Sequence, residues 1–166
     1  MIVLGIDPGT ATTGYGLIAK DNNSINVLDF GVITTTPKEE SHHRLRKIHE
    51  RLNDLIKEFS PTEMAVEQLF FNTNITTAIT VGQARGVALL AAARFELSLG
   101  EYTPLQVKQA ITGYGAARKN QVQQMVKTVL GLDEIPRPDD AADALAIAVC
   151  HVNSAGLLSK IKAAGD

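Results

Sequence analysis

The sequence has little cysteine and no long apolar run, and both absences exclude classes of protein. Cys150 is the one cysteine among 166 residues, so the chain cannot form an internal disulfide. We interpret Cys150, within the helical-looking ALAIAVCHV, as a core residue of a protein from a reducing compartment. No apolar stretch is long and uncharged enough to span a bilayer, and the start, MIVLGID, lacks signal-peptide features. We therefore expect a cytoplasmic protein without membrane contact.

Internal repeats, linkers and low-complexity segments are also missing. A length of 166 residues, with 45% hydrophobic and 20% charged residues, is enough for one globular domain with a substantial core. We predict a single domain over residues 1–156 and a C-terminal tail over residues 157–166 that frays.

Acidic residues are absent from the segment between Tyr102 and Leu132, although the net charge of the chain is only −2. The cations of this segment are Lys108, Arg118, Lys119 and Lys127. A cluster of acids follows directly: Asp133, Glu134, Asp139, Asp140 and Asp143. This distribution indicates a polarised surface, which the overall charge conceals.

The first 35 residues predict three strands in an antiparallel meander. The apolar run from Ile2 to Ile6 is typical of a strand buried on both faces. Gly14 and Gly16 indicate a tight return into the second strand, and Gly31 indicates a bulge in the third.

Strands and helices then alternate. We predict helices over residues 41–59 and 74–96 and strands over residues 63–70 and 97–104. Three further helices begin near Leu105, Asn120 and Asp139, the second with a capping box formed by Asn120 and Gln123. This order is typical of an α/β domain with a mixed five-stranded sheet flanked by helices. The strands that carry Asp7, Glu67 and Tyr102 should be parallel neighbours.

Carboxylates follow the apolar parts of two of these strands. Asp7 and Glu67 would then stand at the same sheet edge, where open α/β sheets bind their ligands. Asp140 and Asp143 share one face of the last helix, which packs on the core through Leu145. Converging carboxylates repel one another unless cations lie among them, and oxygen ligands favour Mg²⁺ or Mn²⁺. Two such ions held by carboxylates can cleave a phosphodiester.

Each acid also has a simpler interpretation. Asp7 before Pro-Gly fits a turn, Glu67 could face solvent, and Asp140 could cap the last helix with Asp143 as its partner. The histidines His42, His43 and His49 lie near a helix start, and we interpret them as a solvated face.

Several motifs together resemble the RuvC Holliday-junction resolvases of bacteria. They are GIDPGTATTGYG, VEQLFF, GQARGVALLAA, VKQAITGYGAARKNQVQQMV and DDAADALAIA, in order from Ile2 to His151. The resemblance implies a ribonuclease H-like fold and a homodimer. It also implies an endodeoxyribonuclease that nicks two strands of a four-way junction symmetrically with Mg²⁺, in recombination and repair. A branch-migration motor is an implied partner.

The resemblance also assigns roles to individual residues. The metal-binding and catalytic acids fall on Asp7, Glu67, Asp140 and Asp143, with Asp139 as an extra acid beside the pair. The functional lysines fall on Lys108 and Lys119, and the aromatic residue beyond the glutamate falls on Phe70. Beside a glycine loop and a helix start, Arg118 and Lys119 are suited to contact phosphate. Phe70 and Phe71 lie on opposite faces, so one packs inward and the other can stack on an unpaired base.

Three other functions share some of these features. An actin-like or sugar-kinase ATPase has a similar first loop, but it needs a second domain, for which 166 residues leave no room. A ribonuclease H-like nuclease acting on RNA and a non-catalytic junction-binding module remain as alternatives.

Overall fold

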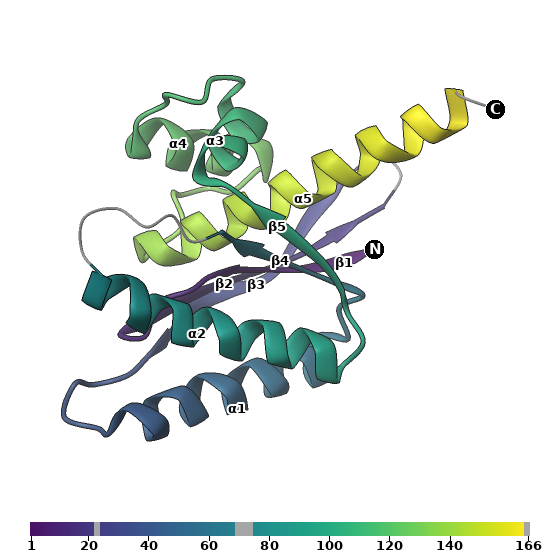
Figure 1. Cartoon of the computed structure of the whole chain (residues 1–166). Helices are drawn as coiled ribbons and strands as arrows, with labels where there is room; N and C mark the ends of the chain where they lie inside the picture. Colours follow the sequence, from purple (N-terminus) through teal and green to yellow (C-terminus); the bar gives the residue numbers. More distant parts are fainter. Residues whose placement is uncertain (22–23, 69–74, 165–166) are drawn as a thin grey trace.

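The computed structural model places two helices on one face of a β-sheet and three on the other (Figure 1). It describes residues 1–21, 24–68 and 75–164. The strands are β1 (Ile2–Asp7), β2 (Thr12–Lys20), β3 (Ile25–Thr34), β4 (Glu63–Glu67) and β5 (Ser98–Tyr102). The helices are α1 (Ser41–Phe59), α2 (Ile75–Arg94), α3 (Pro104–Thr112), α4 (Lys119–Val129) and α5 (Asp139–Ala164). Among the described residues, no helix combines the length and the apolar character needed to cross a membrane.

The sheet is mixed, in the order β3-β2-β1-β4-β5. Strands β1, β2 and β3 pair antiparallel, and β4 pairs parallel with both β1 and β5. These pairings confirm the predicted mixed five-stranded sheet, its meander and the parallel arrangement of the strands that carry Asp7, Glu67 and Tyr102.

The register of the parallel strands puts Asp7 and Glu67 on one face of the sheet. Ile6 lies opposite Val66, and both belong to the core beneath α1 and α2. Because successive side chains of a strand point to opposite faces, the next residues, Asp7 and Glu67, face α5. The strands therefore end in two neighbouring carboxylates on the side that α5 covers.

Glycines let the backbone of α5 lie directly on β1 and β2. A Cβ atom at Gly14 would lie 2.0 Å from the carbonyl oxygen of Asp140, and one at Gly5 would lie 2.2 Å from that of Ala144. The prediction of a tight return at Gly14 and Gly16 is therefore wrong, since both lie inside β2. Gly14 is the strand partner of Asp7, so this contact brings the start of α5 to the first acid.

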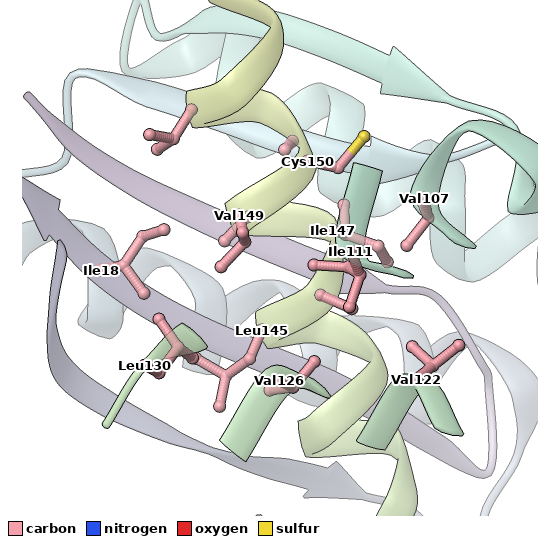
Figure 2. Close-up of a cluster of buried hydrophobic side chains, with 14 of the residues drawn as sticks. Ile18, Val107, Ile111, Val122, Val126, Leu130, Leu145, Ile147, Val149 and Cys150 are labelled. Atoms are coloured by element: carbon pink, nitrogen blue, oxygen red, sulfur yellow. The ribbon is translucent and has the colours of Figure 1, made fainter. Parts of the chain in front are cut away.

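Two apolar cores flank the sheet. One lies between the sheet and α3, α4 and α5, and it includes Ile18, Val126, Leu145 and Ile147 (Figure 2). Cys150 is buried in this cluster, and its burial raises the pKa of the thiol to about 11, which confirms its interpretation as a core residue. The second core lies under α1 and α2 and fixes the opposite face of the sheet.

A buried polar chain also attaches α5 to the sheet. The Nε2 atom of His151 lies 2.5 Å from Oε2 of Glu63 in β4, and its Nδ1 atom lies 2.8 Å from the hydroxyl of Tyr102 in β5. The chain holds the helix at two strands, two turns beyond Asp143, and so limits sliding of α5 along the sheet.

Other local predictions also need correction. The irregularity in β3 falls at Leu28, which has no partner between the pairs Leu17–Asp29 and Ile18–Val27, and not at Gly31. Helix α4 begins at Lys119, and the side chain of Gln121 accepts a hydrogen bond from the Arg118 amide. The predicted box of Asn120 and Gln123 is therefore wrong, because Gln123 is buried instead. Helix α5 extends as far as Ala164, and the fraying of the last residues stays a prediction.

The glycine contact can be tested with Gly14→Ala. The added methyl group would displace the α5 backbone, so the free energy of unfolding should fall by about 1–3 kcal/mol, as for overpacked cores. Urea unfolding measures the change. Gly115→Ala is the matched control, because its methyl group meets first the movable end of the exposed Leu105 side chain and should cost less. Equal stability of the Gly14 variant and the wild type would contradict the contact.

Candidate active site

A cleft at the end of the parallel strands collects acids and lysines from five elements. Asp7 comes from β1, Glu67 from β4 and Asp143 from α5, and all three line the cleft. Lys108 of α3 and Lys119 of α4 line it as well. The predicted convergence of acids from distant parts of the chain is therefore present in the structure.

Burial and mutual repulsion raise the pKa values of the three acids that line the cleft. Burial raises the pKa of Asp7 to about 7, with further contributions from the charges of Glu67, Asp143 and Asp140. Burial and the charge of Asp143 likewise raise the pKa of Glu67, while Lys108 opposes the shift. The pKa of Asp143 is also raised, chiefly by burial. Such a set favours a bound proton or a bound cation.

The two aspartates at the start of α5 have different surroundings. Asp140 adds to the repulsion on Asp7, although it does not line the cleft itself. Asp139 pairs with Arg137, whose Nη1 atom lies 2.7 Å from its Oδ1 atom. The nearby side chain of Gln123 is the main cause that lowers the pKa of Asp139, and the charge of Lys119 adds to it. These contacts support Asp140, rather than Asp139, as the acid that acts with Asp7.

Asp140 lies inside the helix and does not cap it, because α5 already begins at Asp139. Glu67 is half-buried in the cleft and does not face open solvent. The simpler interpretations of these two acids therefore do not hold.

Lys119 forms ion pairs with two acids at the start of α5. Its Nζ atom lies 3.0 Å from Oδ2 of Asp143 and 3.5 Å from Oδ2 of Asp139. Partial burial lowers the pKa of this lysine, but the hydrogen bond to Asp143 and the charge of Asp143 raise it by more. The net shift is upward, so the ammonium form is favoured. Arg118 precedes α4 with an exposed side chain. Phe70 and Phe71 lie outside the described residues, so their predicted DNA contacts stay predictions.

The donor set fits a hard divalent cation. All four acids (Asp7, Glu67, Asp140 and Asp143) offer carboxylate oxygens, which Mg²⁺ and Mn²⁺ prefer. Their oxygens do not form a closed cage: within residues 1–21, 24–68 and 75–164, only Glu40, His42 and His43 bring three ligand atoms within 4.8 Å of one another. That trio is exposed at the start of α1, and it fits the solvated face predicted for these histidines.

Arg85, for which the sequence patterns predict no role, contacts the backbone of Glu67. Its Nε atom donates a hydrogen bond to the Glu67 carbonyl oxygen at 3.2 Å, and its guanidinium pairs with Glu101. One signal was available: Arg85 is the only charged residue between Ile75 and Ala93. A lone charge in an otherwise uncharged helix usually has a partner.

The order of the strands, with acids at the ends of β1 and β4 and at the start of α5, defines a ribonuclease H-like α/β protein. Residues 3–151 match the family model described as "Crossover junction endodeoxyribonuclease RuvC". The chain belongs to this family, which confirms the resemblance seen in its motifs and the predicted class of enzyme, a nuclease.

Individual relatives agree over almost the whole chain. The crossover junction endodeoxyribonuclease RuvC of Alkaliphilus metalliredigens is 55% identical over 162 residues, which cover 98% of this chain and 99% of the relative. That of Halothermothrix orenii is 58% identical over 154 residues, 93% of each chain. The solved structure of T. thermophilus RuvC in complex with Holliday junction substrate has a TM-score of 0.87 and 38% identity, and covers 95% of this chain and 96% of its own.

The raised pKa of Asp7 makes stability depend on pH. Asp7 has a pKa of about 7 in the folded protein and an ordinary value of 3.8, so folding favours the protonated form. Its contribution to the free energy of unfolding therefore falls as the pH rises between these values, and stays low above them. Without metal, Asp7→Asn should be more stable than the wild type near pH 8, by on the order of 4 kcal/mol.

Urea unfolding in a chelating buffer measures this difference. It should shrink as the pH falls toward the ordinary pKa of 3.8. Asp54→Asn, which changes an exposed carboxylate of α1, is the control and should show no such pH-dependent gain. A constant difference across the pH range would show that Asp7 is not destabilised by its surroundings.

Proposed function

We propose that this protein is a structure-specific endodeoxyribonuclease that resolves Holliday junctions in homologous recombination and DNA repair. The observation that carries the proposal is the convergence of acids from β1, β4 and α5 with Lys119, in a chain of the RuvC family. The proposed reaction is hydrolysis: a water oxygen attacks the phosphorus and the bond to the 3′ oxygen breaks. A 5′-phosphate and a 3′-hydroxyl result. The proposed site of action is the cytoplasm.

We propose Mg²⁺ as the cofactor, two ions in each site, with Mn²⁺ as a substitute. The four acids would hold these ions, since they offer only oxygen donors and since burial raises the pKa values of three of them, Asp7, Glu67 and Asp143. When bound, such ions activate the attacking water and stabilise the leaving oxygen.

The cations of the cleft have separate tasks in this proposal. Asp143 and Asp139 hold Lys119 beside the acids in its charged form, so its ammonium can stabilise negative charge on the scissile phosphate. Lys108, on the wall beside Glu67, can contact the same DNA strand. Lys119 and Arg118 also stand at the start of α4, where the positive end of the helix dipole attracts phosphate.

The carboxylates can be tested with Asp7→Asn and Glu67→Gln. Both variants keep the size of the side chain but lose a charge that the cofactor needs. Cleavage of a synthetic four-way junction in Mg²⁺ should fall at least about 100-fold, as after loss of one preorganised charge-stabilising group. Binding of the junction, measured by gel shift, should remain.

The same assay decides between the proposal and its alternatives. Matched duplex DNA and an RNA hybrid are incubated in parallel, with Mg²⁺ and with chelator. Cleavage of the hybrid in preference to the junction would favour a nuclease acting on RNA. Binding without cleavage by the wild type would favour a non-catalytic module. Wild-type cleavage by Asp7→Asn would show that the site is wrongly assigned.

We also propose that α2 forms the interface of a homodimer. Ile79, Gln83, Gly86 and Leu90 recur at helical spacing on its exposed side, and residues Ile79 and Leu90 are 56% and 54% exposed. A Cβ atom at Gly86 would meet nothing within 4 Å, so another backbone has room to approach there. A two-fold axis through this face would relate two active sites and allow paired symmetric nicks. A branch-migration motor is the further partner we propose.

Leu90→Glu tests the interface. A charge on the exposed apolar stripe should convert the dimer to a monomer, as measured by light scattering after size exclusion. A plasmid with an extruded cruciform should then give mainly nicked circles, because paired nicks would no longer be linked. Leu28→Glu, on an exposed leucine of β3, is the matched control and should stay dimeric. A dimeric Leu90 variant with paired nicks would contradict the proposed interface.

A further inference from the structure

We infer that Arg85 is a positioning residue for Glu67, which it holds by the main chain from the rear face of the sheet. The inference rests on the proposed function, because it concerns a carboxylate proposed to bind the metal. Arg85 lies in the middle of α2, on the face of the sheet opposite to the cleft.

The alternation of side chains separates the two faces of this sheet end. Glu101 lies opposite Val66, which belongs to the core under α1 and α2, so Glu101 points toward α2 and pairs with Arg85. Glu67 lies opposite Tyr102, and both point toward α5. Arg85 can therefore contact the Glu67 carbonyl without touching its carboxylate, which stays directed into the cleft.

The backbone of Glu67 needs this support because the sheet ends there. Pairing of β4 with β1 ends at Val66, and pairing with β5 ends at Glu67 and Tyr102. The next backbone hydrogen bond, from the Gln68 amide to the Tyr102 carbonyl at 2.8 Å, comes from the β5 side alone. Arg85 supplies a contact from a third element, α2.

Repulsion acts on the same residue. The negative charges of Asp143 and Asp7 repel the negative charge of Glu67 across the cleft. A carboxylate at an unsupported strand end could move away from them, and the ligand set would open. The guanidinium is planar and presents donors in fixed directions, so one group can bind the Glu67 carbonyl and the Glu101 carboxylate together. Only 18% of the Arg85 side chain is exposed, which limits its freedom further.

A purely structural ion pair between α2 and β5 is the competing explanation. It makes a different prediction, because Glu101→Gln removes the ion pair but leaves an acceptor for Arg85 and leaves the contact with the Glu67 carbonyl. Arg85→Met removes both contacts and keeps an unbranched apolar stem. If Arg85 acts by positioning Glu67, Arg85→Met should weaken metal binding, whereas Glu101→Gln should leave it close to that of the wild type.

Binding of Mn²⁺ to the DNA-free protein, measured by titration calorimetry, is the direct test. Arg85→Met should weaken it by about 10–100-fold, the range found when a group that orients a metal ligand is lost. Arg85→Lys should weaken it in the same direction, since a single ammonium cannot make both contacts in the plane of the guanidinium. Glu101→Gln should stay close to the wild type. The Mg²⁺ concentration for half-maximal junction cleavage should move in parallel.

Circular dichroism melting guards against misfolding, and Arg85→Lys serves as the test if Arg85→Met does not fold. Equal Mn²⁺ affinity of both Arg85 variants and the wild type would overturn the inference. Equal weakening in the Arg85 and Glu101 variants would also overturn it, in favour of the ion pair. Glu67→Gln separates the two levels: if it binds Mn²⁺ and cleaves like the wild type, the proposed metal site itself fails.

Discussion

The contact between the α5 backbone and the glycines of β1 and β2 is the constraint on which the site depends. The acids come from distant parts of the chain, and three of them line one cleft only because α5 starts against Gly14, the strand partner of Asp7. Side chains at Gly5 and Gly14 would hold the helix off the sheet and move its acids away. The chain of Glu63, His151 and Tyr102 then fixes α5 lengthwise. Packing therefore imposes a proximity that charge alone would oppose.

That opposition explains the electrostatics of the cleft. Acids that were free to separate would keep ordinary pKa values, whereas here burial and mutual repulsion raise those of Asp7, Glu67 and Asp143. Lys119 relieves Asp143, and no comparable partner is seen for Asp7 in the described part of the chain. A divalent ion bound as proposed would remove this repulsion, so the free energy that the repulsion costs the metal-free protein would add to the affinity for the ion.

Patterns within single elements predicted most of the fold and the acids. Apolar runs that end in Asp7 and Glu67, with helices between the strands, were enough to place both carboxylates at one edge of a parallel pair. Errors arose where contacts between elements decide. The two glycines of β2 serve the approach of α5 and not a turn, and Gln123 is buried in the fold and does not cap α4. The contacts of Arg85 could not be predicted from the sequence, because its partners, the Glu67 carbonyl and Glu101, come together only in the folded sheet.

The two faces of the sheet have different roles at this end, because the alternation of side chains along the strands directs them to opposite faces. On the face toward α5, the Glu67 side chain of β4 lines the cleft. On the face toward α2, Arg85 donates a hydrogen bond to the backbone carbonyl of the same residue. The neighbouring residue of α2, Gly86, faces outward on the stripe proposed to join two copies. One helix thus touches the rear of a proposed metal ligand and the proposed two-fold axis within a single turn. In the proposed dimer, association of two copies through α2 would steady the strand end on which each proposed site is built.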